Sequence, residues 1–444
     1  MATRGAWGSN AGFILAAVGG AVGLGNLWGF AYSASQGGGA AFVILYFVFV
    51  LFVGLPVLTA ELVIGRHTKR SPVAALGALG GDHLKLKWVG VFFVLVGFGI
   101  LSFYSVIMGW TGRLLIDFVR GAVPEDTAAH FGAISEGFGA IVAHLVGMLL
   151  TIFVITRGVQ RGIERVSVVL MPTLFFLIAS LAVWAATLSG SGPGYAFYLQ
   201  PDLSKIFEAR TITGAAGQAF FSLSLGMGAM ITYASYLPGR GSLPAKAGLI
   251  ALSDTMVAFV GGLVTFPVIF HFGLQQEVSD SAIGALFIAV PRGLLSFGAA
   301  GQYVGIVFFS ALYIAALTSA ISLLEVVSSA AIDSLGWTRS RAGWVAGGVI
   351  ALAGVPGALS SDWVGFLFQL VGQAFLVLGG LVLALIVGYV WKDTARRELL
   401  GGFDHPGLAT AWIWLLRTVV PLMLAVTLYF SVLGLGPLAR ALFS

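Results

Sequence analysis

Nine polar side chains stand inside segments that are otherwise apolar enough to cross a membrane. They are Asn26, Glu61, Tyr104, Ser222, Asp254, Thr318, Ser319, Glu325 and Asp333. A polar or ionisable side chain within a spanning segment is unfavourable and usually functional. Amide, hydroxyl, carboxylate and backbone carbonyl oxygens are the ligands that a hard cation prefers. Because the set has few formal charges and no carboxylate cluster, a monovalent ion such as Na⁺ fits it better than Ca²⁺.

Each of these residues also has an ordinary structural explanation. Serine and threonine in membrane helices mostly donate to a carbonyl of the preceding turn. Asp254 is able to cap a helix, and Tyr104 alone is typical of an interfacial or packing tyrosine. Asp254 nevertheless lies near the start of an apolar segment with no nearby Lys or Arg, which favours a functional role.

Two glycine-rich interruptions position these polar residues. The first, GGAVGLGNLWGF, covers residues 19–30, and the second, SLSLGMGA, covers residues 222–229. The spacing of Gly19 and Gly23 alone is equally typical of close helix packing. Irregular backbone within a membrane is tolerated only where it lines a buried site, however. Two interrupted segments at corresponding positions of two halves indicate a transporter binding site near the midplane.

The composition predicts an all-α, polytopic membrane protein. Of 444 residues, 58% are hydrophobic and only 9% are charged, with a mean hydropathy of +0.99, whereas soluble domains have about 25% charged residues. We expect a single transmembrane domain over residues 1–444 with eleven spanning helices. Their predicted ranges are 11–34, 40–65, 88–118, 138–156, 166–188, 213–236, 246–272, 302–332, 342–359, 364–390 and 411–434.

The distribution of Lys and Arg predicts the orientation. With the N-terminus in the cytoplasm, 16 of the 23 basic residues fall in cytoplasmic segments and 5 in external ones. This asymmetry predicts a cytoplasmic N-terminus and an external C-terminus. It also explains the pI of about 9.5 without nucleic acid as a partner. Short loops and eleven spans favour a bacterial inner (plasma) membrane.

Other chemistries find no support in the sequence. There is no cysteine, so disulfides and thiolate metal sites are excluded. Nucleotide-binding motifs are absent, which makes ATP an unsuitable energy source. His144 and His271 lie in predicted spans, but no recognisable nucleophile motif accompanies them. We therefore do not expect an enzyme.

Linked motifs along nearly the whole chain resemble the neurotransmitter:sodium symporter family, and specifically its bacterial amino-acid branch. The matching segments are AVGLGNLWGF (21–30), GGGAAF (37–42), GLPVLTAELVIGR (54–66), LMPTLFF (170–176), GQAFFSLSLGMGAMITYASY (217–236) and ALTSAIS (316–322). The resemblance implies five plus five helices in inverted repeat, with helices 1 and 6 broken. The first repeat would cover about 1–190, the second about 211–392, and an extra helix about 411–434.

The resemblance also implies two sodium sites and one amino-acid site. The first sodium site would use Asn26, the Ala21 carbonyl, Ser222, Asp254 and the substrate carboxylate. The second would use the carbonyls of Gly19, Val22 and Ala315 with the hydroxyls of Thr318 and Ser319. Substrate binding would involve Ala21, Leu24, Gly25, Ile100, Tyr104, Phe221, Ser222, Ser224, Met227, Ser319 and Leu323. Glu61 matches the acid that supports the broken sixth helix.

Three departures from the family pattern are informative. Asp254 replaces an Asn of the chloride-dependent relatives, so its carboxylate can supply the charge that chloride supplies there. Gly23 replaces an Asp of monoamine carriers, which favours a substrate with its own carboxylate. The outer-gate Arg and Asp correspond to Gly29 and Phe368, so closure would depend on Phe221, Tyr104 and Phe368, or transport would be altered or lost.

The inner gate follows the family pattern. Arg4 and Trp7 precede the first helix, and Asp333 ends the eighth, where the Arg partner is expected. Gly162 and Pro172 bracket a segment that is able to unwind, because proline removes a backbone hydrogen bond. We therefore expect a sodium-coupled symporter that imports neutral apolar L-amino acids, including aromatic ones, independently of chloride. The alternative is a non-transporting amino-acid sensor with a lost outer gate.

Overall fold

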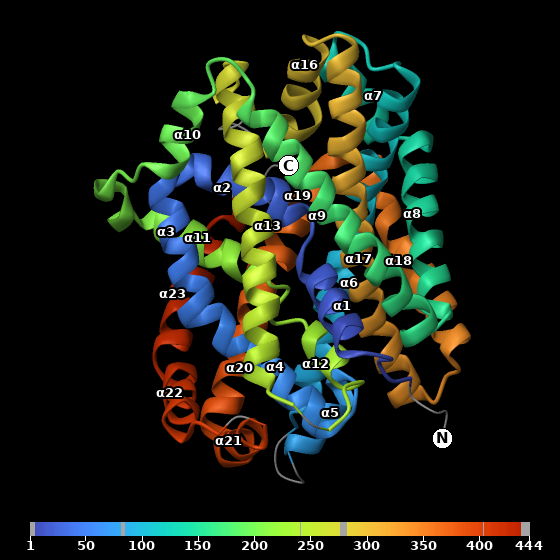
Figure 1. Ribbon diagram of the computed structural model, residues 1–444. Helices are drawn as coiled ribbons and strands as arrows, with labels where there is room; N and C mark the ends of the chain where they lie inside the picture. Colours follow the sequence, from blue (N-terminus) through green and yellow to red (C-terminus); the bar gives the residue numbers. More distant parts are fainter. Residues whose placement is uncertain (1–4, 81–84, 240, 276–281, 403, 437–444) are drawn as a thin grey trace.

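The structure, a computed structural model, describes residues 5–80, 85–239, 241–275, 282–402 and 404–436, and every regular element among them is helical (Figure 1). Nine helices of this part of the chain are long and apolar enough to cross a membrane. They are Ala40–Thr68 (with α3, Ala40–Phe49, and α4, Leu55–Thr68), α6 (Lys87–Arg120), α8 (Phe138–Thr156), Val159–Ala186 (with α9, Arg165–Ala186), α13 (Leu243–His271), α17 (Ala299–Leu335), α18 (Arg339–Leu359), Ser361–Val390 (with α19, Ser361–Leu367, and α20, Leu376–Leu385) and Pro406–Leu433 (with α22, Pro406–Arg417, and α23, Val419–Leu433).

The two other predicted spans are broken helices. The first consists of α1 (Asn10–Ala21) and Gly25–Gln36, which ends in α2 (Phe30–Gln36), and the two halves are bent by 64°. The second consists of α11 (Ala209–Ser222) and the short α12 (Ala229–Ala234). The expected all-α membrane architecture with two broken helices is therefore confirmed.

Short helices cover the two ends of the bundle (Figure 1). At one end lie α7 (Thr127–Ser135), α10 (Gly192–Leu199) and α16 (Val290–Leu295), and at the other lie α5 (Pro72–Gly80) and α21 (Lys392–Leu400). Between the ends, large apolar side chains point outward.

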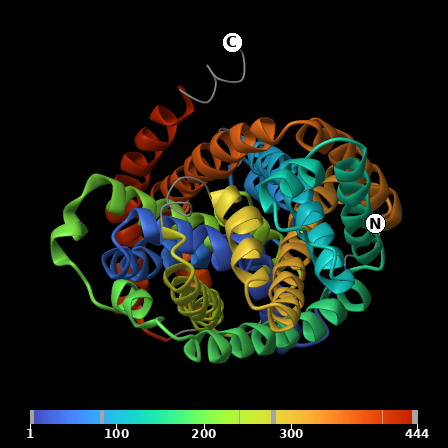
Figure 2. The same ribbon diagram turned by 90° about the horizontal axis from the view of Figure 1, so that it is seen from above.

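Phe176, Val183 and Leu422 are examples of these outward apolar side chains, with exposed fractions of 72%, 69% and 60%. Outward apolar side chains in helices of this length match the lipid tails of a bilayer. Figure 2 shows α22 and α23 at the edge of the bundle, as expected for an appended helix.

The first broken helix lies mainly against long continuous helices, and the second lies mainly against α3, α4 and α23. The first half-helix, α1, contacts α9, α13 and α17, and the π-helical turn after it (η1, Gly25–Gly29) contacts α13. Along the scaffold, α6 packs against α17. The non-helical backbone of both breaks is therefore enclosed by protein, which satisfies the requirement for irregular backbone at membrane depth.

Candidate ion and substrate sites

The first break exposes backbone groups in the middle of the bundle. Helix α1 ends at Ala21 because Val22 is extended (φ −66°, ψ 115°), and helical backbone resumes at Leu24 and Gly25. The Asn26 side-chain oxygen accepts a hydrogen bond of 2.9 Å from the Gly23 amide. The side chain of Asn26 thus stabilises the interruption, which directly precedes the helical turn that contains Asn26.

Asn26, Ser222 and Asp254 form a buried cluster, although they come from three different helices. The Asn26 amide nitrogen lies 2.7 Å from Ser222 Oγ and 2.6 Å from Asp254 Oδ1, and Ser222 Oγ donates to Asp254 Oδ2 over 2.7 Å. Asp254 is completely buried, and no Lys, Arg or His of the described residues forms an ion pair with it.

A buried carboxylate without a cationic partner is unfavourable, so this cluster suits a bound cation. A half-turn of the Asn26 amide would bring its oxygen to the same point, because the two ends of an amide group are nearly isosteric, and it would give up the bond from the Gly23 amide. The donor set of this cluster, made of amide, hydroxyl and carboxylate oxygens, therefore fits a hard monovalent ion.

A second group of oxygens lies where α1 meets α17. Ser319 Oγ lies 3.0 Å from the Val22 carbonyl oxygen and 3.4 Å from that of Gly19. Thr318 donates to the Ala315 carbonyl over 3.1 Å, and also to Ile314 as membrane threonines ordinarily do. A Cβ added at Gly19 would lie 3.2 Å from Thr318 Cβ. The structure thus brings together all five groups predicted for the second sodium site.

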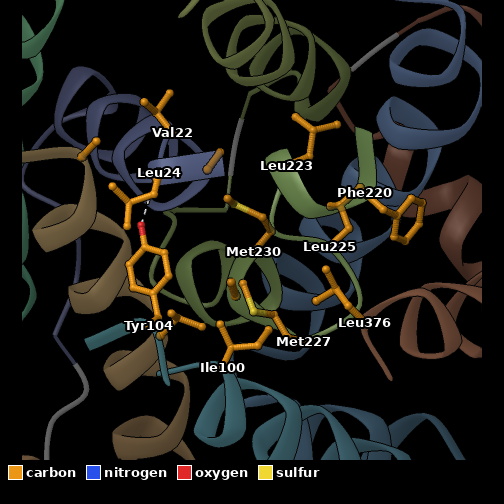
Figure 3. Packing of buried hydrophobic residues seen from close by; sticks show 14 of the residues in the cluster. Val22, Leu24, Ile100, Tyr104, Phe220, Leu223, Leu225, Met227, Met230 and Leu376 are labelled. Atoms are coloured by element: carbon orange, nitrogen blue, oxygen red, sulfur yellow. Dashed lines mark hydrogen bonds between the residues drawn. The ribbon is translucent and has the colours of Figure 1, made fainter. Parts of the chain in front are cut away.

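Tyr104 on α6 points at the first break. Its hydroxyl oxygen accepts a hydrogen bond of 3.2 Å from the Leu24 amide (Figure 3). A Cβ added at Gly23 would lie 2.8 Å from both Tyr104 OH and Ser319 Oγ. Glycine at position 23 therefore keeps open the space between the backbone N–H groups and the tyrosine, where a carboxylate would find its donors.

The second break is held open by the carboxylate of Glu61 on α4. Ser224, Gly226 and Gly228 have positive φ values of 53°, 83° and 74°. A right-handed helix cannot continue through residues with this backbone conformation. Glu61 accepts hydrogen bonds from the amides of Gly226 (2.9 Å), Met230 (3.0 Å) and Ile231 (3.3 Å). The carboxylate thus replaces helical carbonyl partners that the break removes.

A cavity of about 30 Å³ lies between the two breaks. Its lining includes ten of the eleven predicted substrate-binding residues: Ala21, Gly25, Ile100, Tyr104, Phe221, Ser222, Ser224, Met227, Ser319 and Leu323. Leu24 is the exception, since it contributes its backbone amide to Tyr104. A single water needs roughly 10–15 Å³ of such space, so the lining side chains must separate to admit an amino acid.

Aromatic side chains close the cavity on the side of α19. The Phe368 ring packs edge-on against Phe221, with centroids 5.4 Å apart, and against Phe103 at 6.1 Å. Tyr104, which was also expected to take part in closure, lines the same cavity as Phe221, and its hydroxyl accepts a hydrogen bond from the Leu24 amide. Gly29 has only Gln218 within 4 Å of an added Cβ.

Trp7 packs against α12, the second half of the other broken helix. The indole N–H donates to the Tyr233 carbonyl over 2.8 Å, and the indole ring contacts Phe13, Tyr233 and Tyr236. Asp333 Oδ2 accepts a hydrogen bond of 2.7 Å from the Ser71 amide. Arg4, the expected gate partner of Asp333, lies outside the described residues.

The segment expected to unwind is wound in this structure. Gly162 lies in a π-helical turn, Val159–Glu164, that runs directly into α9, so this span begins earlier than the predicted residue 166. A Cβ at Gly162 would lie 2.1 Å from the Val154 carbonyl oxygen, which explains the glycine. Pro172 lies inside α9, where it supplies no N–H to the preceding turn.

Three residues of the site were missed by the sequence analysis. Tyr46 donates to Ser222 Oγ over 3.2 Å, the Gln218 amide donates to the Gly25 carbonyl over 2.8 Å, and Leu376 lines the cavity. Gln218 lies one helical turn before Ser222, a spacing that places both on one face of α11. The other two come from helices without any polar interruption, so no local signal marked them.

Comparison with known proteins agrees with this geometry. The model of the sodium:neurotransmitter symporter family matches residues 4–133 and 125–439. The chain belongs to this family. The finding confirms the resemblance seen in the motifs, and it makes the protein a sodium-dependent transporter of the membrane and not a member of an enzyme family.

The similarity to individual relatives extends over nearly the whole chain of this symporter. An uncharacterized sodium-dependent transporter of Bacillus subtilis, YhdH, is 34% identical over 97% of this chain and 98% of its own length. Another uncharacterized sodium-dependent transporter, from Methanocaldococcus jannaschii, is 33% identical over 96% of this chain and 90% of its own length. The crystal structure of MhsT in complex with L-phenylalanine is similar with a TM-score of 0.87 and 37% identity, covering 97% of this chain and all of that one.

Proposed function

We propose that this symporter couples the inward movement of Na⁺ to the import of a neutral, apolar L-amino acid, including aromatic ones. The observation that supports this most directly is the buried Asp254 carboxylate, which has no cationic partner among the described residues and adjoins the cavity through Ser222. Sodium bound there neutralises the carboxylate. It also attracts the carboxylate of an amino acid in the cavity.

The first sodium would be held by Asn26, the Ala21 carbonyl, Ser222, Asp254 and the substrate carboxylate. The second would be held by the carbonyls of Gly19, Val22 and Ala315 and the hydroxyls of Thr318 and Ser319. The substrate carboxylate would accept hydrogen bonds from Tyr104 and from the Leu24 and Gly25 amides. Coupling follows because the substrate itself completes the first ion site.

The apolar wall supports the substrate class. Ile100, Met227 and Leu323 line the cavity together with Leu376, and methionine adapts to side chains of different shape. Binding of L-phenylalanine by MhsT, which is 37% identical, is consistent with a large apolar side chain at this position. Glycine at position 23 provides no carboxylate at that position to recognise an amine that lacks its own.

Transport would proceed by alternating access. We place the N-terminus in the cytoplasm of a bacterial inner membrane, so that Trp7 closes the inner side and Phe221 with Phe368 the outer side. The helices that carry the breaks would rock against the scaffold that includes α6 and α17. A membrane potential supplies about 2.3 kcal/mol per charge per 100 mV.

Chloride is not required in this mechanism. A fixed carboxylate beside the first sodium provides the negative charge within hydrogen-bond distance of Asn26 and Ser222. An additional anion would be repelled by Asp254.

Uptake into proteoliposomes tests the proposal. Tritiated leucine, tryptophan and glycine would be offered with inward Na⁺ or K⁺ gradients, each with and without chloride, and protein-free vesicles would serve as the control. We expect sodium-dependent, chloride-independent accumulation of leucine and tryptophan above glycine. A strict chloride requirement would contradict chloride-independent transport. A preference for glycine or a charged amino acid would contradict the proposed substrate class. Saturable sodium-dependent binding without accumulation would indicate the sensor instead.

A further inference from the structure

Phe368 stands behind the cavity and not in its wall. It is the first residue of the π-helical segment Phe368–Phe375 that continues α19. Its ring meets Phe221 at an interplanar angle of 75° and Phe103 at 88°, both edge-on. Phe221 lines the cavity, whereas Phe368 does not belong to the lining residues. The aromatic contact of Phe368 with a lining residue is the one with Phe221.

Phe221 is held from two sides. On one side, the position of a Cβ at Gly25 would lie 2.7 Å from Phe221 Cε1, so the ring lies directly on the first break. On the other side, Phe368 covers it, and the position of a Cβ at Gly372 would lie 3.4 to 3.6 Å from the rings of Phe368, Phe103 and Phe221. Three aromatic rings thus meet over one glycine.

The contacts around this aromatic cluster of Phe103, Phe221 and Phe368 are apolar or uncharged. Gln218, one turn before Phe221, ties α11 to the first break through its bond to the Gly25 carbonyl. None of the ion pairs among the described residues involves α11, η1, α19 or the Phe368–Phe375 segment. Among the described residues, the side-chain contacts within this aromatic cluster are therefore uncharged.

The helix that presents Phe368 is fixed to the scaffold. The amide and hydroxyl of Ser361, the first residue of α19, both donate to Glu136 Oε1, over 2.8 and 3.0 Å. The Gly137 amide donates to the Ala358 carbonyl over 3.0 Å. These bonds join the start of α19 to the start of α8. The Phe221–Phe368 contact is thus one of the points where broken helix α11 meets this part of the chain.

We propose that Phe368 is a positioning residue that closes the cavity by holding Phe221 on the first break, and that this side of the symporter has an aromatic gate in place of an ionic one. The proposal deepens the proposed function, on which its physiological meaning rests. Edge-on aromatic pairs each contribute beyond their buried area, and their strength does not fall with ionic strength as that of exposed ion pairs does.

Thiol accessibility tests the gate without any substrate. The chain has no cysteine, so Ala21→Cys, in the cavity wall, introduces a single reporter. Its reaction rate with a membrane-impermeant thiol reagent would be measured on intact cells, with Phe368→Ala added in one variant. Phe375→Ala is the matched control, because Phe375 lies in the same π-helical segment but contacts Phe92 and is 36% exposed.

We expect Phe368→Ala to accelerate labelling about tenfold, as loss of two aromatic pairs predicts, and Phe375→Ala to leave it unchanged. Phe368→Tyr, which keeps the ring, is expected to restore slow labelling, and Phe368→Leu to give an intermediate rate if the alanine variant folds poorly. The Ala21→Cys variant that retains Phe368 is expected to react with the thiol reagent at the same rate when choline chloride is raised from 0.1 to 1 M.

The proposal would be overturned if the Ala21→Cys reporter were labelled equally fast with Phe368, with Phe368→Ala and with Phe368→Leu. Marked acceleration of labelling by salt would also overturn it. This failure is distinct from failure of the proposed function. An absence of sodium-driven amino-acid uptake in proteoliposomes would refute the transport proposal while leaving the labelling result for the gate intact.

Discussion

The Asn26 amide nitrogen lies 2.6 Å from Asp254 Oδ1, although 228 residues separate the two in the chain. Asn26 follows the break of the first helix, and Asp254 lies inside the continuous α13. Their contact joins one broken and one unbroken helix at a completely buried carboxylate. The chemistry of this pair is the basis of the first prediction.

Asp254→Asn removes the negative charge from the first proposed sodium site. We expect the apparent affinity for sodium to fall at least about tenfold, equivalent to about 1.4 kcal/mol, because a neutral amide attracts the ion less strongly. The measurement is the sodium dependence of leucine uptake, with and without chloride. Asp362→Asn, in the exposed first turn of α19, is the control. An unchanged sodium dependence in Asp254→Asn would refute the assignment of this site.

Gly23→Ala and Gly29→Ala form a matched pair in the same broken helix. The added Cβ at position 23 would lie 2.8 Å from Tyr104 OH and Ser319 Oγ, whereas at position 29 the nearest atom, Gln218 Oε1, is 3.6 Å away. Overpacking typically costs about 1–3 kcal/mol. We therefore expect the KM for substrate to rise about tenfold in Gly23→Ala and to stay near the native value in Gly29→Ala. Similar KM values for the two variants would argue against a substrate carboxylate beside Tyr104.

Glu61→Gln tests the support of the second break. Glutamine offers one acceptor oxygen where the carboxylate accepts from three backbone amides. A buried donor left without a partner costs about 1–3 kcal/mol, so we expect a melting temperature several degrees lower in detergent. Glu208→Gln, whose carboxylate forms an exposed ion pair with Lys205, is expected to change it little. Equal melting temperatures in the two variants would contradict this role of Glu61.

Pro172→Ala tests the unwinding of the fifth span. Alanine supplies the N–H that proline lacks, so the helix from Val159 to Ala186 gains a backbone hydrogen bond and unwinds less readily. We expect sodium release toward the Trp7 side to slow several-fold, measured by stopped-flow dilution. The control is Pro356→Ala, because Pro356 also lies inside a spanning helix, α18. Unchanged release in Pro172→Ala, or equal slowing in both variants, would exclude a specific role of the segment after Gly162.

The helices and much of the site were predictable because the membrane leaves few alternatives. Apolar stretches long enough to span a bilayer must be helical, and glycine clusters at 19–25 and 226–228 marked both breaks in advance. The motifs named residues that the structure gathers around one cavity. Those motifs lie in the broken helices and in the helices that face them.

What sequence reasoning missed came from continuous helices. Tyr46, Leu376 and Phe103 lie in helical segments whose apolar pattern is the same on every face. Which of these side chains points inward depends on helix rotation and tilt, which are set by tertiary packing and not by local composition. Phe103, the neighbour of Tyr104 in the chain, packs against the ring of Phe368.

The separation of polar and apolar cavity walls has a consequence for how this symporter can change. The proposed ion ligands Asn26, Ser222 and Asp254 contact one another, whereas the apolar part of the cavity lining includes Ile100, Met227, Leu323 and Leu376. A substitution in the second set alters the shape available to the amino-acid side chain without touching a sodium ligand. New selectivities are therefore accessible, by evolution or by engineering, to a carrier whose thermodynamic driving force stays the same.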